Sequence, residues 1–523
     1  MLFNSDIFLF VFLPVVLLGY YLLGRVARRA AAGWLIGASF FFYGWWNPAY
    51  VPLLLASVTF NYLCGLAILA NAAAPQRQSV IAILGISANL GALLYYKYLF
   101  PFLGVLHAHG ILGAQFQASI LLPLGISFFT FTQIGYLVDC RQGVAKERGA
   151  TDYFLFVTFF PHLIAGPILH HAEIMPQFAR SETYRLRAEN LSVGFTIFVI
   201  GLAKKVLLAD SLATTADAGF AHFEALRMVG AWSALLSYSL QLYFDFSGYS
   251  DMAIGIARMF GVRFPLNFNS PYKARSIIDF WQRWHMTLTR YITLYLYNPI
   301  VLMITRARVA RGLGISRRAT ATPGGFTTLI VLPTLFTMAI AGIWHGAGLQ
   351  FLIFGLLHGA YLSINHAWRV FGPRTPQVAR FRVRDIAAGV VQWLLTYLAV
   401  LVGQVFFRAD STFSAISLLA RAIGLHGIDL SAADLPAVDI RGDHAQMLHA
   451  LRIAALFAIV WFLPNTQQIM ARFEPTSSKM AEPTQRYWQW QPSLSWGLVI
   501  TVLLVMTLVQ RLGDPAKFLY FQF

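Results

Sequence analysis

His345 lies in the stretch AGIWHGAG (341–348), between two apolar runs, FTTLIVLPTLFTMAI and LQFLIFGLLHGAYL. No acidic residue is close to it in the sequence. An ionisable side chain inside an apolar run is costly, so a functional role is the default hypothesis. Gly342, Gly346 and Gly348 surround the histidine and predict a helix break or a tight turn, because glycine weakens helices. The alternative is a histidine buried only for packing.

His285 is a second candidate, in DFWQRWHMTLTR (279–290), where two tryptophans precede it. From the spacing alone, the simpler interpretation is an interfacial histidine held for packing. Arg283 and Arg290 flank it. Because guanidinium groups bind phosphate through two hydrogen bonds, both arginines are candidates for binding a phosphate-bearing acyl donor. They can equally contact lipid head groups.

Two carboxylates occur in an apolar setting, Asp245 and Asp251, within LQLYFDFSGYSDMAIGIARMFG (240–261). They can line a polar cavity, cap helices or pair with Arg258.

We predict no metal site. His170, His171 and Glu173 are the residues that could suggest one, but their spacing matches no standard ligand set. The chain also lacks the G-x-S-x-G motif of serine nucleophiles and the H-x-x-x-x-D pattern of soluble acyltransferases.

The elements that must position these residues are membrane helices. Of the 523 residues, 58% are hydrophobic and 12% are charged, about half the charged fraction of soluble domains. Many apolar runs approach or exceed the roughly 18 residues that can span a bilayer. We therefore predict an all-α, polytopic integral membrane protein, organised as a single transmembrane domain over 1–523. The predicted spans are 7–24, 32–46, 50–70, 79–100, 121–139, 152–169, 191–209, 230–246, 326–344, 347–365, 386–406, 449–464 and 493–510.

The net charge of +17 suits this class. Cytoplasmic loops of membrane proteins collect Lys and Arg, and contacts with anionic lipid or an anionic substrate can add to the excess, so we expect no nucleic-acid partner. GRVARRA, after the first span, is expected in the cytoplasm, with the N-terminus outside. Arginine clusters at 306–318 and in 369–384 also read as cytoplasmic. The chain then crosses the membrane and returns between these two clusters, and His345 lies at the turn. It is near the outer face if both apolar runs span the bilayer fully, and inside the membrane if they are broken.

Residues 261–305 mix aromatic side chains with Arg, Lys and Asp. Trp and Tyr favour the membrane interface, so we expect helices that lie along or dip into the cytoplasmic interface.

Several stretches in this order resemble the membrane-bound O-acyltransferases, most closely the bacterial polysaccharide O-acetyltransferase branch, of which alginate O-acetyltransferase is the type. The resemblance covers about 3–425, and the C-terminal spans, about 449–523, match less distinctively. The stretches that carry it are FNSDIFLFVFLPVV, YYKY (95–98), LPLGISFFTFTQIGYLVD (122–139), FFPHLIAGPILH (159–170), YFDFSGYSDMAIGIARMFG (243–261), DFWQRWHMTLTR (279–290), GIWHGAGLQFLIFGLLHG (342–359) and QVFFRADS (404–411).

The resemblance implies a helical funnel with broken or re-entrant and interfacial helices in the bacterial inner membrane, so the N-terminus that the charge pattern places outside would be periplasmic. It also implies that His345 is the catalytic histidine and His285 the second characteristic one. The expected donor is acetyl-CoA, with no tightly bound cofactor. The expected acceptor is an exported polysaccharide of the alginate type or a periplasmic relay acetyltransferase. Candidates for stabilising the oxyanion or lining the tunnel are Trp344, Gly346, Asp245 and Asp251.

One segment departs from the family pattern, in which the Trp-His stretch is followed by Arg-Asp-Tyr and then Ile-Pro-Leu-Gly-Gly. Here RYITLYLYNPIVLMI (290–304) follows, without the Arg-Asp pair or the Gly-Gly. The change bears on donor handling or partner docking more than on the chemistry at His345.

Three other functions stay open from the sequence. The first is D-alanyl transfer of the teichoic-acid type. The second is a transporter or flippase for a lipid-linked glycan, with His345 as a proton relay. The third is an inactive scaffold in an export complex, for which His345 would be dispensable.

Overall fold

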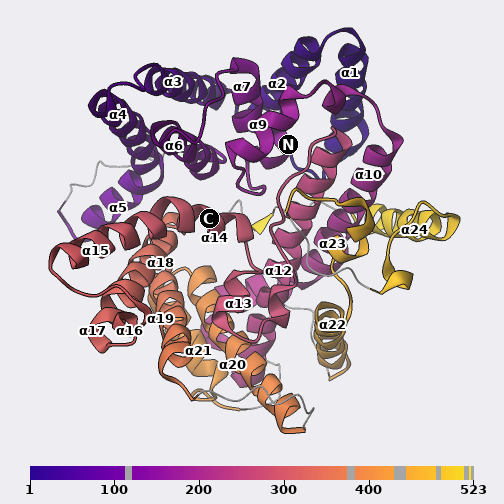
Figure 1. The fold of residues 1–523 in the computed structure, drawn as a ribbon. Helices are drawn as coiled ribbons and strands as arrows, with labels where there is room; N and C mark the ends of the chain where they lie inside the picture. Colours follow the sequence, from indigo (N-terminus) through magenta and orange to yellow (C-terminus); the bar gives the residue numbers. More distant parts are fainter. Residues whose placement is uncertain (112–120, 374–382, 429–442, 479–484, 512–517, 520–523) are drawn as a thin grey trace. The chain divides into compact units, whose positions relative to one another are not determined.

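A computed structural model describes residues 1–111, 121–373, 383–428, 443–478, 485–511 and 518–519. Within these ranges every regular element is a helix and there is no β-strand (Figure 1). The predicted all-α class is therefore confirmed for the part of the chain that is described.

The chain forms two compact units that alternate along the sequence. Unit 1 comprises Met1–Leu207, Asp245–Leu266 and Thr466–Gln522. Unit 2 comprises Leu208–Phe244 and Asn267–Asn465. Helix α12 (Met228–Met259) contributes its first part to unit 2 and its second part to unit 1. The prediction of a single domain over 1–523 stays a prediction.

Unit 1 has a core of aromatic side chains contributed by its N-terminal helices. Phe8, Phe42 and Phe160 are buried, and the ring of Phe42 lies 6.0 Å from Phe8 and 5.3 Å from Phe160. Its helices are α1 (Leu13–Val26), α2 (Arg28–Gly44), α3 (Val51–Ala70), α4 (Pro75–Leu93), α5 (Phe100–Ala108), α6 (Ile126–Gln142), α7 (Ala150–Thr158), α8 (Phe160–Leu163), α9 (His171–Ala179), α10 (Ala188–Ala203), α23 (Thr466–Ile469) and α24 (Leu494–Gln510). Helices α3, α4 and α6 pack against one another (Figure 1).

Unit 2 is built around the pair α18 (Leu332–His345) and α19 (Leu349–Phe371), and α20 (Val383–Arg408) packs on α19 (Figure 1). Its other helices are α11 (Asp210–Ala221), α13 (Ile277–Trp281), α14 (Met286–Ile292), α15 (Asn298–Ala310), α16 (Arg317–Thr320), α17 (Pro323–Phe326), α21 (Thr412–Ala422) and α22 (Asp443–Phe462). Proline occupies the first turn of α17, where its missing N–H costs no hydrogen bond.

Six helical runs among the described residues are long and apolar enough to cross a membrane. Each corresponds to a predicted span, which confirms a polytopic membrane protein. They are Ile7–Val26, Pro48–Ala70, Pro75–His107, Ala188–Ala221, Pro323–His345 and Ile386–Arg408.

The predicted span at 152–169 is wrong as a single helix. Helix α7 ends at Thr158, and the four-residue helix α8 follows after Phe159, whose ψ of 112° is not helical. Pro161 explains the break, because it cannot donate the hydrogen bond that would continue α7.

The segment 261–305, expected as interfacial helices, contains the short helix α13 and most of a run that is helical from Met286 to Ala310, but no candidate span. Its place in a bilayer stays a prediction. Residues 374–382, within the second arginine cluster, lie outside the described residues.

Candidate active site

Close backbone packing holds the α18–α19 pair together. A Cβ atom on Gly342 would lie 2.2 Å from the carbonyl oxygen of Phe351, and one on Gly355 would lie 2.2 Å from that of Met338. Real Cβ atoms do not approach backbone oxygens this closely. Glycine at both positions therefore lets the two helices approach each other at the turn that carries His345.

His345 is the last residue of α18. From Pro323 the chain is helical without interruption to this residue, through α17, a π-helical segment (Thr327–Val331) and α18. The backbone then becomes extended at Gly346, and α19 begins at Leu349. The predicted break is confirmed, and it follows the histidine rather than interrupting the apolar run before it.

Aromatic side chains surround the imidazole of His345, which is 7% exposed. The ring of Phe407, from α20, lies 4.9 Å away in an edge-to-face arrangement, and that of Phe354, from α19, lies 6.0 Å away. Three helices of unit 2 thus fix the position of this ring.

His285 precedes the first residue of α14 with φ of +42°, a left-handed conformation that is uncommon for residues other than glycine. Its Nδ1 lies 3.0 Å from Oδ1 of Asn267, which also accepts from the Thr287 hydroxyl at 2.8 Å and the Thr287 backbone N–H at 3.4 Å. The Met286 N–H donates to the Asn267 carbonyl at 2.9 Å. Asn267 therefore anchors the turn through both its side chain and its backbone.

These bonds determine the tautomer of His285. A backbone N–H can only donate, so the Asn267 atom facing Thr287 is the amide oxygen, and His285 must donate to it from Nδ1. In the neutral ring Nε2 then carries the lone pair. His285 is 2% exposed and lies outside the six candidate spans, and its burial lowers its pKa from 6.5 to about 3. Its imidazole is neutral near pH 7.

A continuous series of packed rings joins the two histidines within unit 2. Neighbouring centroids are 4.7 to 6.5 Å apart, close enough for each ring to limit the position of the next. The series runs from His345 through Phe354, His358, Phe280, Trp284 and Phe268 to His285.

His358, in the middle of this series, is a residue that the sequence reasoning missed. It is 1% exposed, and its Nδ1 accepts a hydrogen bond from the indole N–H of Trp281 at 3.3 Å. Since indole can only donate, the neutral His358 ring carries its proton on Nε2. The available signal was a histidine within the apolar run LLHG.

Two candidates for stabilising an oxyanion adjoin His345. Trp344 is 5% exposed, and its ring lies 4.7 Å from that of His345. The backbone N–H of Gly346 donates to the carbonyl of Ile343 at 3.2 Å, so this group would have to exchange that bond for one to a reacting oxygen. Their roles stay predictions.

Asp245 and Asp251 lie in unit 1, whereas His345 lies in unit 2. Asp245 forms a buried ion pair with Lys205 at 2.5 Å, and Asp251 contacts Lys204 at 2.6 Å. Asp251 also accepts from the side chains of Thr466 and Gln467. The pairing with Arg258 considered from the sequence is not observed among these contacts, because Arg258 pairs with Glu189.

The two arginines beside His285 differ in their contacts. Arg283 forms an ion pair with Asp279 at 2.7 Å and donates to the Asn269 carbonyl, which ties the arginine to its own turn. Arg290 lies partly exposed in α14. Donor binding by either residue stays a prediction.

Residues 113–313 match the sequence model of MBOAT, the membrane-bound O-acyltransferase family. The matched residues include His285 and end before His345. The chain is also 38% identical to the peptidoglycan O-acetyltransferase of Helicobacter pylori, covering 100% of this chain and 98% of that protein.

Two further relatives widen the comparison. The chain is 35% identical to the probable alginate O-acetylase AlgI of Pseudomonas putida, with 100% of both chains covered. It is 28% identical to the teichoic acid D-alanyltransferase of Bacillus subtilis over 46% of this chain and 58% of that one. The relatives that match over the full length are thus O-acetylases.

Proposed function

Because this chain belongs to the membrane-bound O-acyltransferase family and is an O-acyltransferase of the polysaccharide O-acetylase type, we propose that it moves an acetyl group across the bacterial inner membrane, with His345 as the catalytic base. The acetyl group comes from a cytoplasmic thioester, for which acetyl-CoA is the proposed substrate. It goes to a hydroxyl on the periplasmic side, where the N-terminus also lies.

The observation that carries this proposal is the position of His345. It is buried and ends an uninterrupted 23-residue apolar helix that is long enough to cross a bilayer. The arginine-rich segment before this helix is the side expected in the cytoplasm. A histidine at the far end can meet an acceptor that comes from outside, while a long donor reaches it from the cytoplasm.

The reaction needs a base at this place. A hydroxyl attacks a thioester slowly until its proton is removed, and a neutral imidazole suits that task near pH 7. His345 takes the hydroxyl proton, the oxygen bonds to the thioester carbon, and an oxyanion forms. The carbon–sulfur bond then breaks, and the thiolate takes the proton from His345. The products are an acetyl ester and a free thiol.

His285 has a different role in this proposal. Its Nδ1–H is held by Asn267, so its Nε2 is the nitrogen that can accept a hydrogen bond from an acceptor hydroxyl. We assign it to orienting the acceptor. Asn267 acts through His285 and is a positioning residue.

The acceptor is a hydroxyl of an envelope polysaccharide or of a periplasmic relay acetyltransferase. Two relatives that match over the full chain are named for peptidoglycan and alginate, so both polymers are candidates. D-alanyl transfer is less favoured, since that relative matches only 46% of this chain.

The test compares ester-linked acetyl on purified peptidoglycan and on secreted polysaccharide in a deletion strain. The strain carries the wild-type protein, His345→Ala or His426→Ala at matched expression. His426 is an exposed histidine of the same unit and serves as the control.

We expect one polymer to lose acetyl in the His345→Ala strain to the level of the deletion, while His426→Ala behaves as wild type. The polymer that loses acetyl identifies the acceptor pathway. Unchanged acetyl in His345→Ala overturns the proposed base. Collapse of polymer export in the deletion strain would instead support a transporter.

A further inference from the structure

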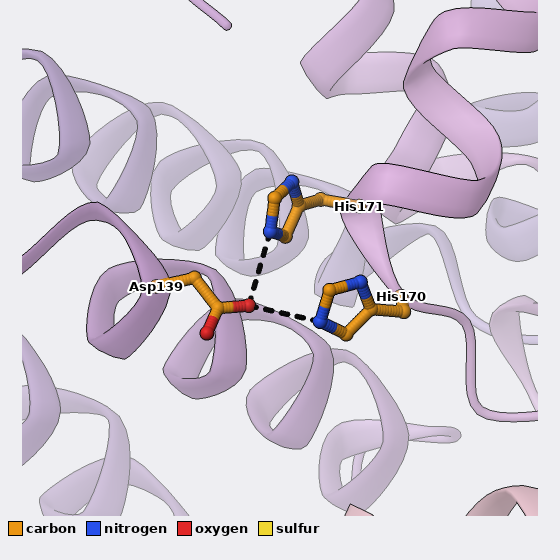
Figure 2. A group of neighbouring side chains, drawn as sticks. All are labelled: Asp139, His170 and His171. Atoms are coloured by element: carbon orange, nitrogen blue, oxygen red, sulfur yellow. Dashed lines mark hydrogen bonds and ion pairs between the residues drawn. The ribbon is translucent and has the colours of Figure 1, made fainter. Parts of the chain in front are cut away.

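Three side chains of unit 1 meet at one point (Figure 2). Nε2 of His170 and Nε2 of His171 each lie 3.0 Å from Oδ2 of Asp139. The three ligand atoms lie within 4.8 Å of one another. Asp139 and His171 are buried, with 5% and 1% exposure, and His170 is partly exposed. The proposed acyl transfer uses none of these residues.

Local backbone structure fixes both sides of this cluster. Helix α6 ends at Gln142, and Gly143 follows it with φ of +72°. The N–H groups of Val144 and Ala145 both donate to the Asp139 carbonyl. This closes the end of α6 tightly and holds Asp139 on its last turn. On the other side, His170 is extended and His171 is the first residue of α9, so two consecutive residues direct their rings to the same carboxylate.

His171 lies between two carboxylates. Its Nε2 is 3.0 Å from Asp139 Oδ2, and its Nδ1 is 3.5 Å from Glu147 Oε2. A neutral imidazole has one N–H and one lone pair, so one ring nitrogen would turn its lone pair toward a carboxylate oxygen. A cation bound between Nε2 and Asp139 would remove this mismatch, because the lone pair would then face the cation and the N–H would face Glu147.

The distances leave room for such a cation, although 3.0 Å is also an ordinary hydrogen-bond distance. A tetrahedral zinc ion holds nitrogen and oxygen ligands at about 2.1 Å, which places the ligand atoms about 3.4 Å apart. The observed 3.0 Å separations are within a few tenths of an ångström of this value. Histidines that bind metals usually donate their other N–H to a carboxylate, which is the position of Glu147 relative to His171.

We propose that Asp139, His170 and His171 form a binding site for a divalent transition-metal ion that ties the end of α6 to the start of α9. Two imidazoles and one carboxylate are a donor set that zinc accepts, with a fourth position left for water. The sequence pattern suggested Glu173 as the acid beside the histidines. The fold supplies Asp139 instead, from a helix about 30 residues earlier.

The three ligands are not equivalent. His170 Nδ1 accepts a hydrogen bond from the Ala172 N–H at 3.3 Å, so its neutral ring carries the proton on Nε2. To bind the ion through Nε2, His170 must move this proton to Nδ1 and open that contact. His171 has no backbone contact of this kind to open, and a proton on its Nδ1 would face Glu147 at 3.5 Å while Nε2 binds the ion. Asp139 and His171 are therefore the main ligands and His170 the weaker one.

The test uses the full-length protein purified in detergent through a tag that contains no histidine. Metal content is measured by mass spectrometry on the protein as isolated. The protein is then treated with a chelator and titrated with Co²⁺, whose visible absorption reports tetrahedral binding, and with Zn²⁺, followed by thermal unfolding. The variants are Asp139→Asn, His171→Ala and His170→Ala. His109→Ala, which removes an exposed histidine of the same unit, is the control.

We expect wild type and His109→Ala to bind about one equivalent of Co²⁺ and to melt at a higher temperature with Zn²⁺. Asp139→Asn and His171→Ala should bind more than tenfold more weakly, with a smaller loss in His170→Ala. Absence of the Co²⁺ absorption and of a Zn²⁺ effect in the wild type overturns the proposal. Equal binding by wild type and His171→Ala also overturns it. The wild-type titration tests the proposed metal binding even if a variant fails to fold.

Discussion

His345 and His171 are both buried histidines, but their surroundings differ in kind. The ring of His345 packs edge to face against Phe354 and Phe407 in unit 2. The ring of His171 lies between the carboxylates of Asp139 and Glu147 in unit 1. Aromatic rings fix the position of an imidazole by packing, whereas carboxylates offer it hydrogen-bond acceptors.

This difference separates two uses of one residue type. A histidine that is positioned by ring packing suits the proposed role of taking a proton from a substrate and giving it back. A histidine held by carboxylates is suited to bind a cation and join secondary structure elements. Burial alone therefore does not identify the reactive histidine, and the groups that touch the ring do.

Replacing His345 or His171 by glutamine should give the largest difference between the two sites, one in transfer rate and the other in stability. His345→Gln should lower the rate of acetyl transfer by about 10²- to 10⁴-fold, the usual contribution of a general base, with little change in melting temperature. His171→Gln should lower stability by about 1–3 kcal/mol, because the buried carboxylate of Asp139 loses its partner at Nε2. Transfer rates and thermal unfolding of both purified variants check this. A loss of stability in His345→Gln together with a loss of rate in His171→Gln would contradict the proposed division of roles.

The close α18–α19 packing predicts the next largest effect. Gly342→Ala places a methyl group against the Phe351 carbonyl and should destabilise unit 2 by about 1–3 kcal/mol and reduce transfer. Gly33→Ala is the matched control, since a Cβ there meets nothing within 4 Å. Thermal unfolding and transfer rates should both distinguish the two variants; equal behaviour would mean that the helices can separate without loss.

Asn267→Ala should lower the stability of the folded protein by about 1–3 kcal/mol, because it removes the acceptor for His285 Nδ1–H and for the Thr287 hydroxyl. Asn267→Asp keeps an acceptor at this position and should recover more of the transfer rate than Asn267→Ala. The readout is the rate at limiting and at saturating acceptor concentration. If the transfer rate per folded molecule is unchanged in both variants, Asn267 does not position His285 for the reaction.

A smaller effect is expected in the pH dependence of stability. The unfolded chain protonates the imidazole of His285 as the pH falls below about 6.5, while burial lowers the pKa in the folded protein to about 3. The unfolded state thus binds more protons between these values. This group then removes up to about 1.4 kcal/mol of stability for each unit by which the pH falls. Melting temperatures measured from about pH 7.5 to 5 should fall less steeply in His285→Gln, and an unchanged slope would contradict the assignment.

Much of the fold could be read from the sequence because apolar runs and their breaks have strong local signals. The turn after His345 follows from its glycines, and six predicted spans match helical runs of sufficient length. The predicted span at 152–169 failed because hydropathy ignores hydrogen bonding, and Pro161 cannot continue a helix.

Candidate sites were harder to predict, because their residues come from distant parts of the chain. His345 and His285 were identified individually, but the rings that join them, with His358 in the middle, come from three separate segments. Asp245 and Asp251 looked available in the sequence, yet each is paired with a lysine. Asp139 could not be associated with His170 and His171 by spacing, since only the fold of unit 1 brings the three side chains together.

The central claim is that His345 passes an acetyl group from one side of the membrane to the other. The most direct measurement reconstitutes the protein in vesicles with labelled acetyl-CoA sealed inside and supplies, outside, fragments of the polymer that loses acetyl in the deletion strain. Where that loss runs through a relay protein, the relay is supplied instead. We predict that wild type transfers label to the outer acceptor and releases thiol inside, while His345→Gln does both at least about 100-fold more slowly. Transfer by His345→Gln at the wild-type rate would contradict the account.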